Sequence, residues 1–298
     1  MAGRLPIWLT AAALVAVFTV LHAQDAVITS HMRGQSVAPA FEGWEENLDG
    51  SFNLVFGYFN RNWDEALTIP VGANNTLEPG GPDQGQPTHF LPRRNRFIFR
   101  IRVPKDFGTK EVVWTLTSNG ETEKAYGTLK PGYYMDDDVI VANMGVAPGS
   151  TTLELQNLNR GPSLEVPSPL RREVRVGDTI DLVAVANDDG IPKKRELSIR
   201  PALSASQVTI ASALGLRLSW FVYRGDGAAV VFDPPQFKTY EDTRWGSPWA
   251  PGWKVPPVPD GNKWLVHATF KAPGTYVLRC LAHDGAMMTA RDITVTVK

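Results

Sequence analysis

Strict alternation of apolar residues near the carboxyl end is the feature that most constrains the fold of this 298-residue chain. Every second residue is apolar from 276 to 282, and again from 293 to 297. Because successive side chains of a β-strand point to opposite faces of a sheet, each run predicts a strand with one buried face. A turn signal, Asp284-Gly285, lies between the two runs. The runs therefore predict a β-hairpin, with Arg279 on its solvent-facing side.

Three runs with the same period lie in the first half of the chain, at residues 51–60, 97–103 and 112–117. In the second run Phe97 and Phe99 are expected on one face of the strand. An Asn-Gly turn after the third run predicts another hairpin. No window has a sustained apolar period of 3.6 residues, so we expect few and short helices.

The length of the chain is sufficient for two domains, and 43% of its residues are hydrophobic. Residues 38–146 predict a first β-sandwich and residues 170–298 a second one, joined by a linker at 147–169 that is punctuated by proline and glycine. The second domain carries a long proline-rich insert at 233–262. We therefore expect an all-β protein of two β-sandwich domains.

A set of turn and strand residues recurs through the second half of the chain. Its members are Asp188, Asp189, Gly190, Trp220, Phe270, Pro273, Gly274, Tyr276, Leu278, Ala282, Asp284, Gly285 and the strand 294–297. In this pattern the chain resembles the PKD-like and Ig-like domains of secreted bacterial proteins. The resemblance implies a sandwich but no particular function, because this fold hosts many unrelated activities.

Three phrases in the first half carry a second resemblance. They are GYFNRN at 57–62, GQPTHFLPRR at 85–94 and VPKDFG at 103–108. Through them the first half is similar to a family of exported bacterial proteins of unknown role. This resemblance implies a domain and an exported protein, and it supplies no chemistry.

Residues 1–23 have the pattern of a signal peptide, with the positive charge of Arg4, an apolar core and a cleavage point before Gln24. An uncleaved membrane anchor is the alternative, but the apolar run is short for a span. We expect an exported protein, periplasmic or extracellular, without stable membrane insertion after cleavage. A single cysteine, Cys280, excludes an intrachain disulfide.

The charge balance argues against nucleic acid as a partner. The chain has 30 basic and 31 acidic residues, whereas nucleic-acid binders usually carry an excess of Lys and Arg. Nucleophile elbows, zinc-binding helices and phosphate loops have no match in the sequence. Glu45 and Glu46 cannot serve as a glycosidase pair, because adjacent residues in one strand point in opposite directions. The protein is therefore more readily explained as a non-enzyme.

Aromatic residues in the insert are candidates for ligand binding. Trp245, Trp249 and Trp253 recur every four residues, and Tyr240 and Arg244 lie close to them in the sequence. Prolines between them forbid a regular helix. On an irregular loop, such side chains can form a flat platform for sugar rings or peptide prolines. The alternative is that they fold back as a satellite core that pins the loop.

Basic residues at the end of a long polar stretch, residues 71–96, are candidates for anion binding. Loops of this length are either functional or disordered. His89, Arg93, Arg94 and Arg96 could clamp an anionic group. The alternative is a solvated strand edge.

Asp188, Asp189 and Asp284 are candidate calcium ligands, since loop carboxylates at one end of a sandwich supply hard oxygen donors. The same residues suit tight turns, because aspartate accepts hydrogen bonds from the backbone two residues further on. Turn chemistry is the favoured interpretation, and no other cofactor is expected.

Cys280, His283 and Met288 have the spacing of a blue-copper loop, with His267 as the nearby second imidazole. The expected upstream histidine is missing. The favoured alternative makes Cys280 a small core residue and His283 part of a turn.

The function that the sequence supports best is an exported, non-enzymatic binding or structural protein of the cell envelope, with a glycan or an envelope protein as its partner. The alternative is a carbohydrate-binding accessory module or a carbohydrate-active enzyme that uses the Trp-rich insert. A copper-binding, cupredoxin-like protein is a more remote one.

Overall fold

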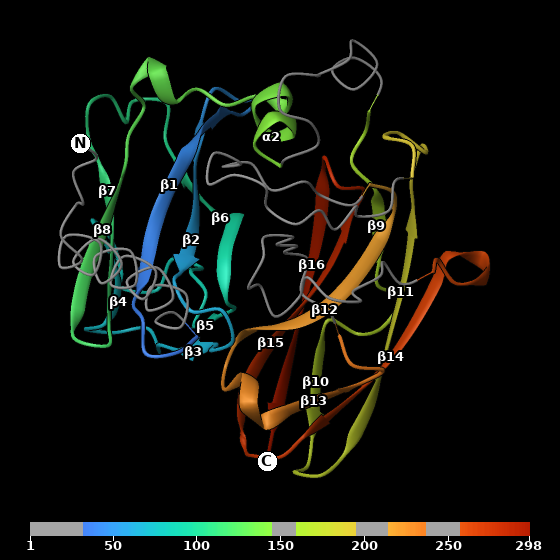
Figure 1. Cartoon of the computed structure of the whole chain (residues 1–298). Coiled ribbons are helices and arrows are strands. Elements are labelled where there is room, and N and C mark those ends of the chain that lie inside the picture. The colour runs from blue at the N-terminus through green and yellow to red at the C-terminus, as the bar shows by residue number, and fades with distance from the viewer. Residues whose placement is uncertain (1–31, 145–158, 195–213, 237–256) are drawn as a thin grey trace, which may run out of the picture.

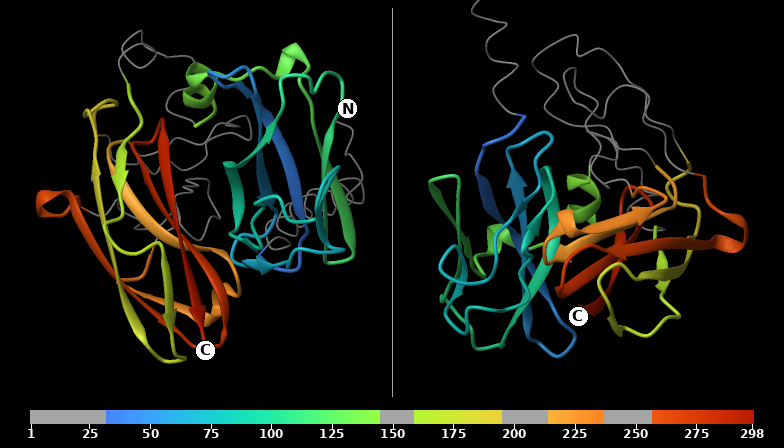
Figure 2. Two further views of the ribbon diagram at one scale, coloured as in Figure 1. Left: turned by 180° about the vertical axis from the view of Figure 1, so that it is seen from behind. Right: turned by 90° about the horizontal axis from the view of Figure 1, so that it is seen from below.

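The computed structural model describes residues 32–144, 159–194, 214–236 and 257–298, which form two β-sandwiches (Figure 1). The expectation of an all-β fold is therefore confirmed. Both views in Figure 2 place the two sandwiches side by side. Within the described ranges, none of the helices combines the length and the apolar character that a membrane span requires.

Two three-stranded antiparallel sheets and a two-stranded ribbon make up the first sandwich. One sheet has the order β1 (Val37–Glu46), β2 (Phe52–Asn60) and β6 (Arg93–Val103). The other has the order β4 (Asn75–Glu78), β7 (Val112–Ser118) and β8 (Glu121–Gly127). The ribbon pairs β3 (Leu67–Thr68) with β5 (His89–Phe90).

Aromatic side chains fill the core of the first sandwich. Phe56 of β2 stacks on Phe99 of β6 with ring centroids 5.4 Å apart, and Trp114 of β7 meets both rings edge-on. Trp114 is fully buried, and its Nε1 donates a hydrogen bond to Oδ1 of Asn75 at 3.0 Å. A large apolar ring can be buried here at low cost because its one polar atom has a partner.

A bulge in β6 overturns one expectation from the sequence. The single residue between Phe56 and Tyr58 of β2 is matched by three residues of β6. Inside this bulge Phe97 has a positive φ of 54°, and its side chain packs with Met135 in a separate cluster from the one that holds Phe99. The expectation that Phe97 and Phe99 share a face is therefore wrong, because the left-handed backbone at Phe97 and the two extra residues of the bulge interrupt the regular alternation of the strand.

Two four-stranded sheets form the second sandwich. One has the order β10 (Arg171–Val174), β16 (Met288–Val297), β15 (Gly274–His283) and β12 (Arg217–Arg224). The other has the order β13 (Val230–Asp233), β14 (Lys263–Phe270), β11 (Thr179–Asn187) and β9 (Ser163–Glu165). Strand β9 falls within the segment predicted as linker, and it pairs with β11.

The carboxyl-terminal hairpin is confirmed. Strands β15 and β16 pair antiparallel from Gly274 opposite Val297 to His283 opposite Met288. The buried face of β15 joins Trp220 of β12 in the core between the sheets. Alternation identified these strands because one face meets a core along their whole length.

Short helices complete the described chain. They are η1 (Pro131–Tyr133), α2 (Asp137–Asn143), η2 (Gly227–Ala229) and η3 (Asp260–Asn262). Helix α2 begins after Asp136, whose carboxylate accepts a hydrogen bond from the backbone N–H of Val139. The helix lies between the sandwiches (Figure 1), and its Val141 packs with Leu214 and Ala286 of the second one.

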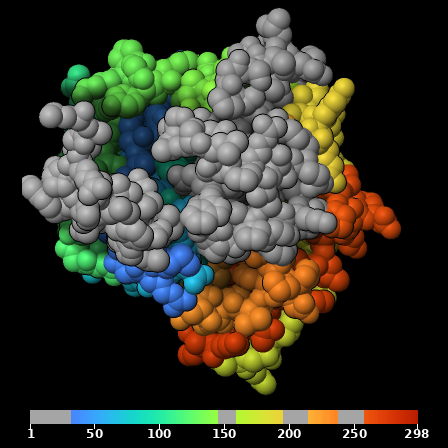
Figure 3. Space-filling view, in the orientation of Figure 1, coloured from blue at the N-terminus to red at the C-terminus, as the bar shows by residue number. Residues whose placement is uncertain are grey.

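The sheet that contains β12 and β15 faces the first sandwich. In the space-filling view the blue and cyan surface of the first sandwich abuts the orange surface of the second (Figure 3). The side chain of Arg279 is only 12% exposed, and its Nη1 donates to the backbone oxygen of Ile98 in the first sandwich. The expectation that Arg279 faces solvent is therefore wrong, because a second domain covers this face.

Candidate functional site: the domain joint

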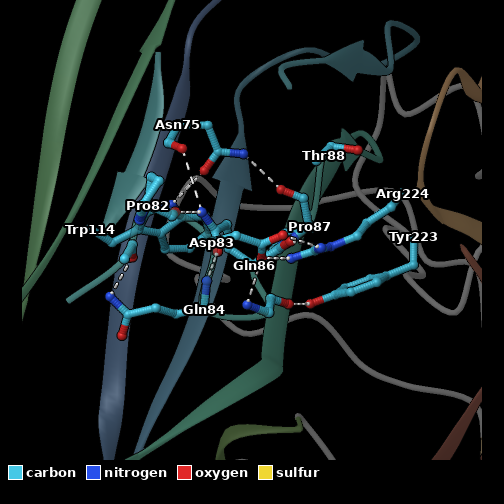
Figure 4. Close-up of polar contacts among 12 residues, drawn as sticks. Asn75, Pro82, Asp83, Gln84, Gln86, Pro87, Thr88, Trp114, Tyr223 and Arg224 are labelled. Carbon is cyan, nitrogen blue, oxygen red and sulfur yellow. Dashed lines mark hydrogen bonds and ion pairs between the residues drawn. The ribbon is translucent and has the colours of Figure 1, made fainter. Parts of the chain in front are cut away.

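The most elaborate polar arrangement in the described residues joins the two sandwiches, and we call it the domain joint. From the first sandwich it includes Asp83, Gly85, Gln86, Thr88, His89 and Ile98. From the second sandwich it includes Tyr223, Arg224, Gly225, Gly227 and Arg279. Figure 4 shows its central part.

Buried amide side chains hold the loop that supplies Asp83 and Gly85. Asn75 donates through Nδ2 to the backbone oxygen of Pro87 at 2.8 Å, and its Oδ1 accepts from Trp114 (Figure 4). Nδ2 also donates to the backbone oxygen of Ile69 at 3.0 Å. A loop rich in proline and glycine has carbonyls that no strand partner satisfies, so an amide that donates and accepts can fix it.

Two glutamines continue this framework. Gln86 is fully buried; its Nε2 donates to the oxygen of Pro82 at 2.6 Å, and its Oε1 accepts from the backbone N–H of Gln84 at 2.8 Å. Gln84 in turn donates through Nε2 to the oxygens of Pro79 and Gly81, each at 3.0 Å. The loop therefore presents a fixed shape to the second sandwich.

An ion pair connects this loop to the end of β12. Arg224 donates through Nη1 and Nη2 to the two oxygens of Asp83, at 3.0 and 2.7 Å, and through Nε to the backbone oxygen of Gln86 at 2.8 Å (Figure 4). The hydrogen bond from Arg224 lowers the pKa of the Asp83 carboxyl. A guanidinium fork matched to both carboxylate oxygens fixes orientation as well as distance.

Tyr223 and its neighbours add three hydrogen bonds between the domains. The Tyr223 hydroxyl donates to the backbone oxygen of Gly85 at 2.5 Å, and its backbone oxygen accepts from the N–H of Thr88 at 3.1 Å. The N–H of Gly225 donates to Oγ1 of Thr88 at 2.9 Å. Burial of the phenol raises the pKa of Tyr223 to about 12. These backbone contacts tie the end of β12 to the residues just before β5.

Arg279 forms a second attachment point. Its guanidinium lies over the Tyr223 ring, 3.6 Å from the centroid, and pairs through Nε and Nη2 with both oxygens of Asp292. Its Nη1 reaches the backbone oxygen of Ile98 at 2.5 Å. Ile98 directly follows Phe97 in the bulge of β6, so the irregularity that sequence alternation missed carries the acceptor for the other domain.

His89 fills a gap against Gly227. A Cβ atom placed on Gly227 would lie 2.2 Å from Nε2 of His89, so only glycine leaves room for the imidazole. The other ring nitrogen, Nδ1, is 3.1 Å from Oγ1 of Thr68. Burial lowers the pKa of His89 to about 4. The ring is therefore neutral at pH 7 and acts as a packing element of the joint.

The residues proposed as an anion clamp make separate contacts. The Arg93 guanidinium lies over the rings of Phe59 and Trp63, whereas Arg94 pairs with the buried carboxylate of Glu42 at 2.6 Å. The charge of Arg96 lowers the pKa of Glu42, although burial has the larger effect and raises it. Arg94 is therefore paired with Glu42, and the charge of Arg96 acts on the same carboxylate, whereas the contacts of His89 and Arg93 described above are with other groups. Anion binding stays a prediction.

The proposed ligand-binding residues of the insert lie outside the described residues. They are Tyr240, Arg244, Trp245, Trp249 and Trp253. Whether they bind a ligand or pack as a satellite core stays a prediction, as does the signal peptide at 1–23.

The copper candidates occupy different surroundings. Cys280 is fully buried in the core of the second sandwich, where burial raises the pKa of its thiol. His267 lies on β14 beside Asp181, with Nδ1 2.8 Å from Oδ1. His283 is buried, and its Nε2 accepts from Nε of Arg217 at 2.8 Å. The interpretation of Cys280 as a core residue is confirmed.

The three aspartates proposed for calcium all take part in turns. Asp188 accepts from the N–H of Gly190 at 2.9 Å, Asp189 from that of Ile191 at 2.8 Å, and Asp284 from that of Ala286 at 2.6 Å. In the described ranges, no group of three or more His, Cys, Asp or Glu side chains lies close enough to hold a metal ion. A metal site here would need other oxygen donors as well.

Comparisons with known proteins do not assign the chain to a family. No family model matches the sequence, and no curated protein is significantly similar to it.

Solved structures give loose superpositions. The Titin M10–Obscurin-like 1 Ig complex has a TM-score of 0.25 and 15% identity, covering 47% of this chain and 95% of that one. The D00-D0 domain of intimin has 0.24 and 9%, covering 88% and 100%. The fibronectin(III)-like modules of CbhA from Clostridium thermocellum have 0.22 and 9%, covering 88% and 94%. The superpositions are too loose to support an argument about function.

Proposed function

We propose that this protein is an exported, non-enzymatic structural or binding component of the cell envelope, in which the two sandwiches work as one rigid unit. The observation that carries the proposal is the domain joint, above all the two-pronged pair between Asp83 and Arg224 and the hydrogen bond from Tyr223 to Gly85.

Domains connected only by a linker move relative to each other unless their interface is strong. Here the contacts include charge-assisted hydrogen bonds, backbone hydrogen bonds and an apolar cluster in which Phe97 and Met135 pack with Met288. Such a joint fixes the angle between the sandwiches. A fixed angle suits a spacer, or a support that holds a binding surface at a set distance.

The chemistry of the joint also favours a structural role. The polar groups that meet there already bond to one another, and His89 is held neutral by burial. A catalytic group needs a free, suitably ionised atom facing a substrate. The case for export rests on the sequence of residues 1–23, and the lone buried cysteine is compatible with an oxidising compartment.

Distance measurements between spin labels test the rigid unit. Cysteines introduced as Tyr126→Cys in the first sandwich and Leu265→Cys in the second would carry the labels, since both positions are exposed whereas the native Cys280 is buried. We expect a single narrow distance distribution. A broad distribution in the otherwise unchanged protein would overturn the proposal.

Variants separate the joint from general effects. Arg224→Ala should broaden the distribution, because it removes the pair with Asp83 and the bond to Gln86. Arg100→Ala is the matched control: it removes a two-pronged pair with Glu45 inside the first sandwich and should leave the distribution narrow.

The alternative from the sequence is sugar binding by the insert. It rests on Trp245, Trp249 and Trp253, which lie outside the described residues. Glycan-array binding of the wild type and of Trp249→Ala tests it. Glycan binding by the wild type that Trp249→Ala abolishes would favour this alternative. Absence of binding to every glycan on the array would refute it.

A further inference from the structure

Polar atoms without partners gather at one end of the second sandwich, where β11 and β15 finish. Asp188 directly follows β11, Asp284 directly follows β15, and Asn159 lies a few residues before β9. Each of these three residues has at least one buried side-chain atom with no hydrogen-bond partner. Buried polar atoms are almost always bonded, so such a group calls for an explanation.

Asp284 is the most constrained of the three. Its side chain is fully buried, and Oδ1 accepts hydrogen bonds from the backbone N–H groups of Ala286 at 2.6 Å and Met287 at 2.7 Å. Oδ2 has no partner. The turn therefore uses one carboxylate oxygen and leaves the other free inside the protein, which is costly for an ionised group without a counter-charge.

Asp188 and Asn159 lie next to this carboxylate. Burial is the main cause that raises the pKa of Asp284 to about 6. The charge of Asp188 contributes to this rise, while the backbone N–H groups of Met287 and Ala286 and the nearby Asn159 amide oppose it. Asn159 is only 3% exposed, yet neither its Oδ1 nor its Nδ2 makes a hydrogen bond of acceptable geometry. Asp188 uses Oδ2 for its turn and leaves a buried Oδ1 without a partner.

Two neighbouring side chains are not available to bind a further group, because they already make hydrogen bonds. The Asp189 carboxylate accepts from the N–H of Ile191 at one oxygen and from the N–H of Arg160 at the other, both at 2.8 Å. His283 accepts the Arg217 Nε–H at Nε2, so its neutral ring carries the proton on Nδ1, which is then a donor and no metal ligand. Three oxygen donors remain.

We propose that Asp188, Asp284 and Asn159 form a binding site for a calcium ion. Two carboxylates and an amide oxygen are hard donors, and calcium accepts six to eight oxygen ligands of mixed kind, including backbone carbonyls and water. The ion supplies the positive charge and the bonds that these buried oxygens otherwise lack. The site includes two of the three aspartates expected from the sequence, replaces Asp189 by Asn159, and is independent of the domain joint.

A pocket borders the site at Asp188. Its volume is about 290 Å³, and Asp188, Gly190, Gly215 and Asn262 contribute to its lining. Lys194 lines the pocket too, and its positive charge opposes cation binding. We therefore expect the affinity of an extracellular calcium module, with a Kd of roughly 0.1–1 mM.

Calorimetry and thermal unfolding of the full chain, stripped of metal by a chelator, test the site. We expect saturable binding of about one calcium ion and a rise in Tm of roughly 3 °C or more near 10 mM calcium. Magnesium should give a smaller shift, because it requires a smaller octahedral set of ligands. No binding heat and no Tm shift with calcium would overturn the proposal, and an equal shift with magnesium would overturn the assignment to calcium.

Substitutions locate the ion. Asp188→Asn and Asp284→Asn should each weaken binding at least about tenfold, whereas Asp181→Asn, an exposed aspartate on the outer face of β11, should leave it unchanged. Asn159→Asp keeps the shape of the side chain and adds a ligand charge, so it should strengthen calcium binding while it destabilises the calcium-free protein. If Asp188→Asn and Asp284→Asn fold and bind calcium like the wild type, the ion lies elsewhere. If either fails to fold, unchanged or weaker binding by Asn159→Asp overturns the site by itself.

Discussion

The guanidinium of Arg279 lies over the ring of Tyr223, 3.6 Å from its centroid. Both members of this pair come from the second sandwich, and each reaches a different segment of the first: Tyr223 bonds to Gly85 in the polar loop, and Arg279 bonds to Ile98 in the bulge of β6. The stacked pair therefore couples two attachment points that lie apart in the sequence. A change in either side chain should loosen both.

Arg279→Lys should destabilise the protein even though it keeps the charge. Lysine cannot pair with both oxygens of Asp292, bond to Ile98 and stack on Tyr223 at the same time, because it lacks the planar fork. We expect a loss of about 2 kcal/mol or more in the free energy of unfolding, measured by urea denaturation. Arg291→Lys, on the same hairpin, is the control that should change little, because among the described residues the Arg291 side chain makes one long hydrogen bond, to the backbone oxygen of Ala290 at 3.4 Å. Equal effects of the two substitutions would contradict this role of Arg279.

Gly227→Ala should destabilise the joint by steric conflict with His89. The added methyl group would lie 2.2 Å from Nε2 of the imidazole, and a forced fit of this kind typically costs about 1–3 kcal/mol. Gly132→Ala, in open space, serves as the control. The double variant Gly227→Ala with His89→Ala should recover part of the loss, because the ring that causes the conflict is gone. A purely additive double-mutant cycle would mean that the two residues do not meet.

Cys280 should be inert in the folded protein. It is fully buried, and burial raises the pKa of its thiol, whereas thiol reagents attack the exposed thiolate. We expect one slow reaction whose rate follows global unfolding, measured with a chromogenic disulfide reagent. A cysteine introduced as Tyr126→Cys should react at once, since that position is half exposed. Fast modification of Cys280 in the native protein would show that the second core opens locally.

The sequence allowed the strands to be predicted wherever alternation and burial coincide. The hairpin of β15 and β16 was found this way, because Tyr276, Leu278 and Cys280 meet the core along an unbroken register. The same rule failed at Phe97, where the bulge shifts the register and turns the ring to another cluster. The apolar period of one segment does not reveal extra residues in a strand, because a bulge is defined only by how the strand pairs with its neighbour, here β2.

The domain joint could not be predicted residue by residue. The sequence predicted residues 71–96 as one long loop that is either functional or disordered. The structure instead places β4, β5 and the start of β6 within this range, and the connection between β4 and β5 supplies Asp83 and Gly85. Its partner, Arg224, looks like any charged residue at the end of a strand, and Tyr223 looks like a core aromatic. Their roles depend on how the two sandwiches dock, which spacing within one domain does not encode. The surplus of glutamine and asparagine in a loop rich in proline and glycine was the available signal.

Acid should weaken the protein through His89. Burial lowers the pKa of this residue to about 4, below the value near 6.5 that it has in the unfolded chain, and the nearby charge of Asp226 only partly opposes the shift. As the pH falls, the unfolded state therefore takes up the proton first. The contribution of the neutral ring to the free energy of unfolding is fully present above pH 6.5. It is lost as the pH falls from 6.5 to 4, and the loss is roughly 3 kcal/mol at most. His89→Asn cannot take up this proton, and it retains a polar atom for Thr68. The free energy of unfolding should therefore fall less steeply from pH 7 to pH 4.5 in the variant than in the wild type, and equal slopes would show that His89 is not held neutral at the joint.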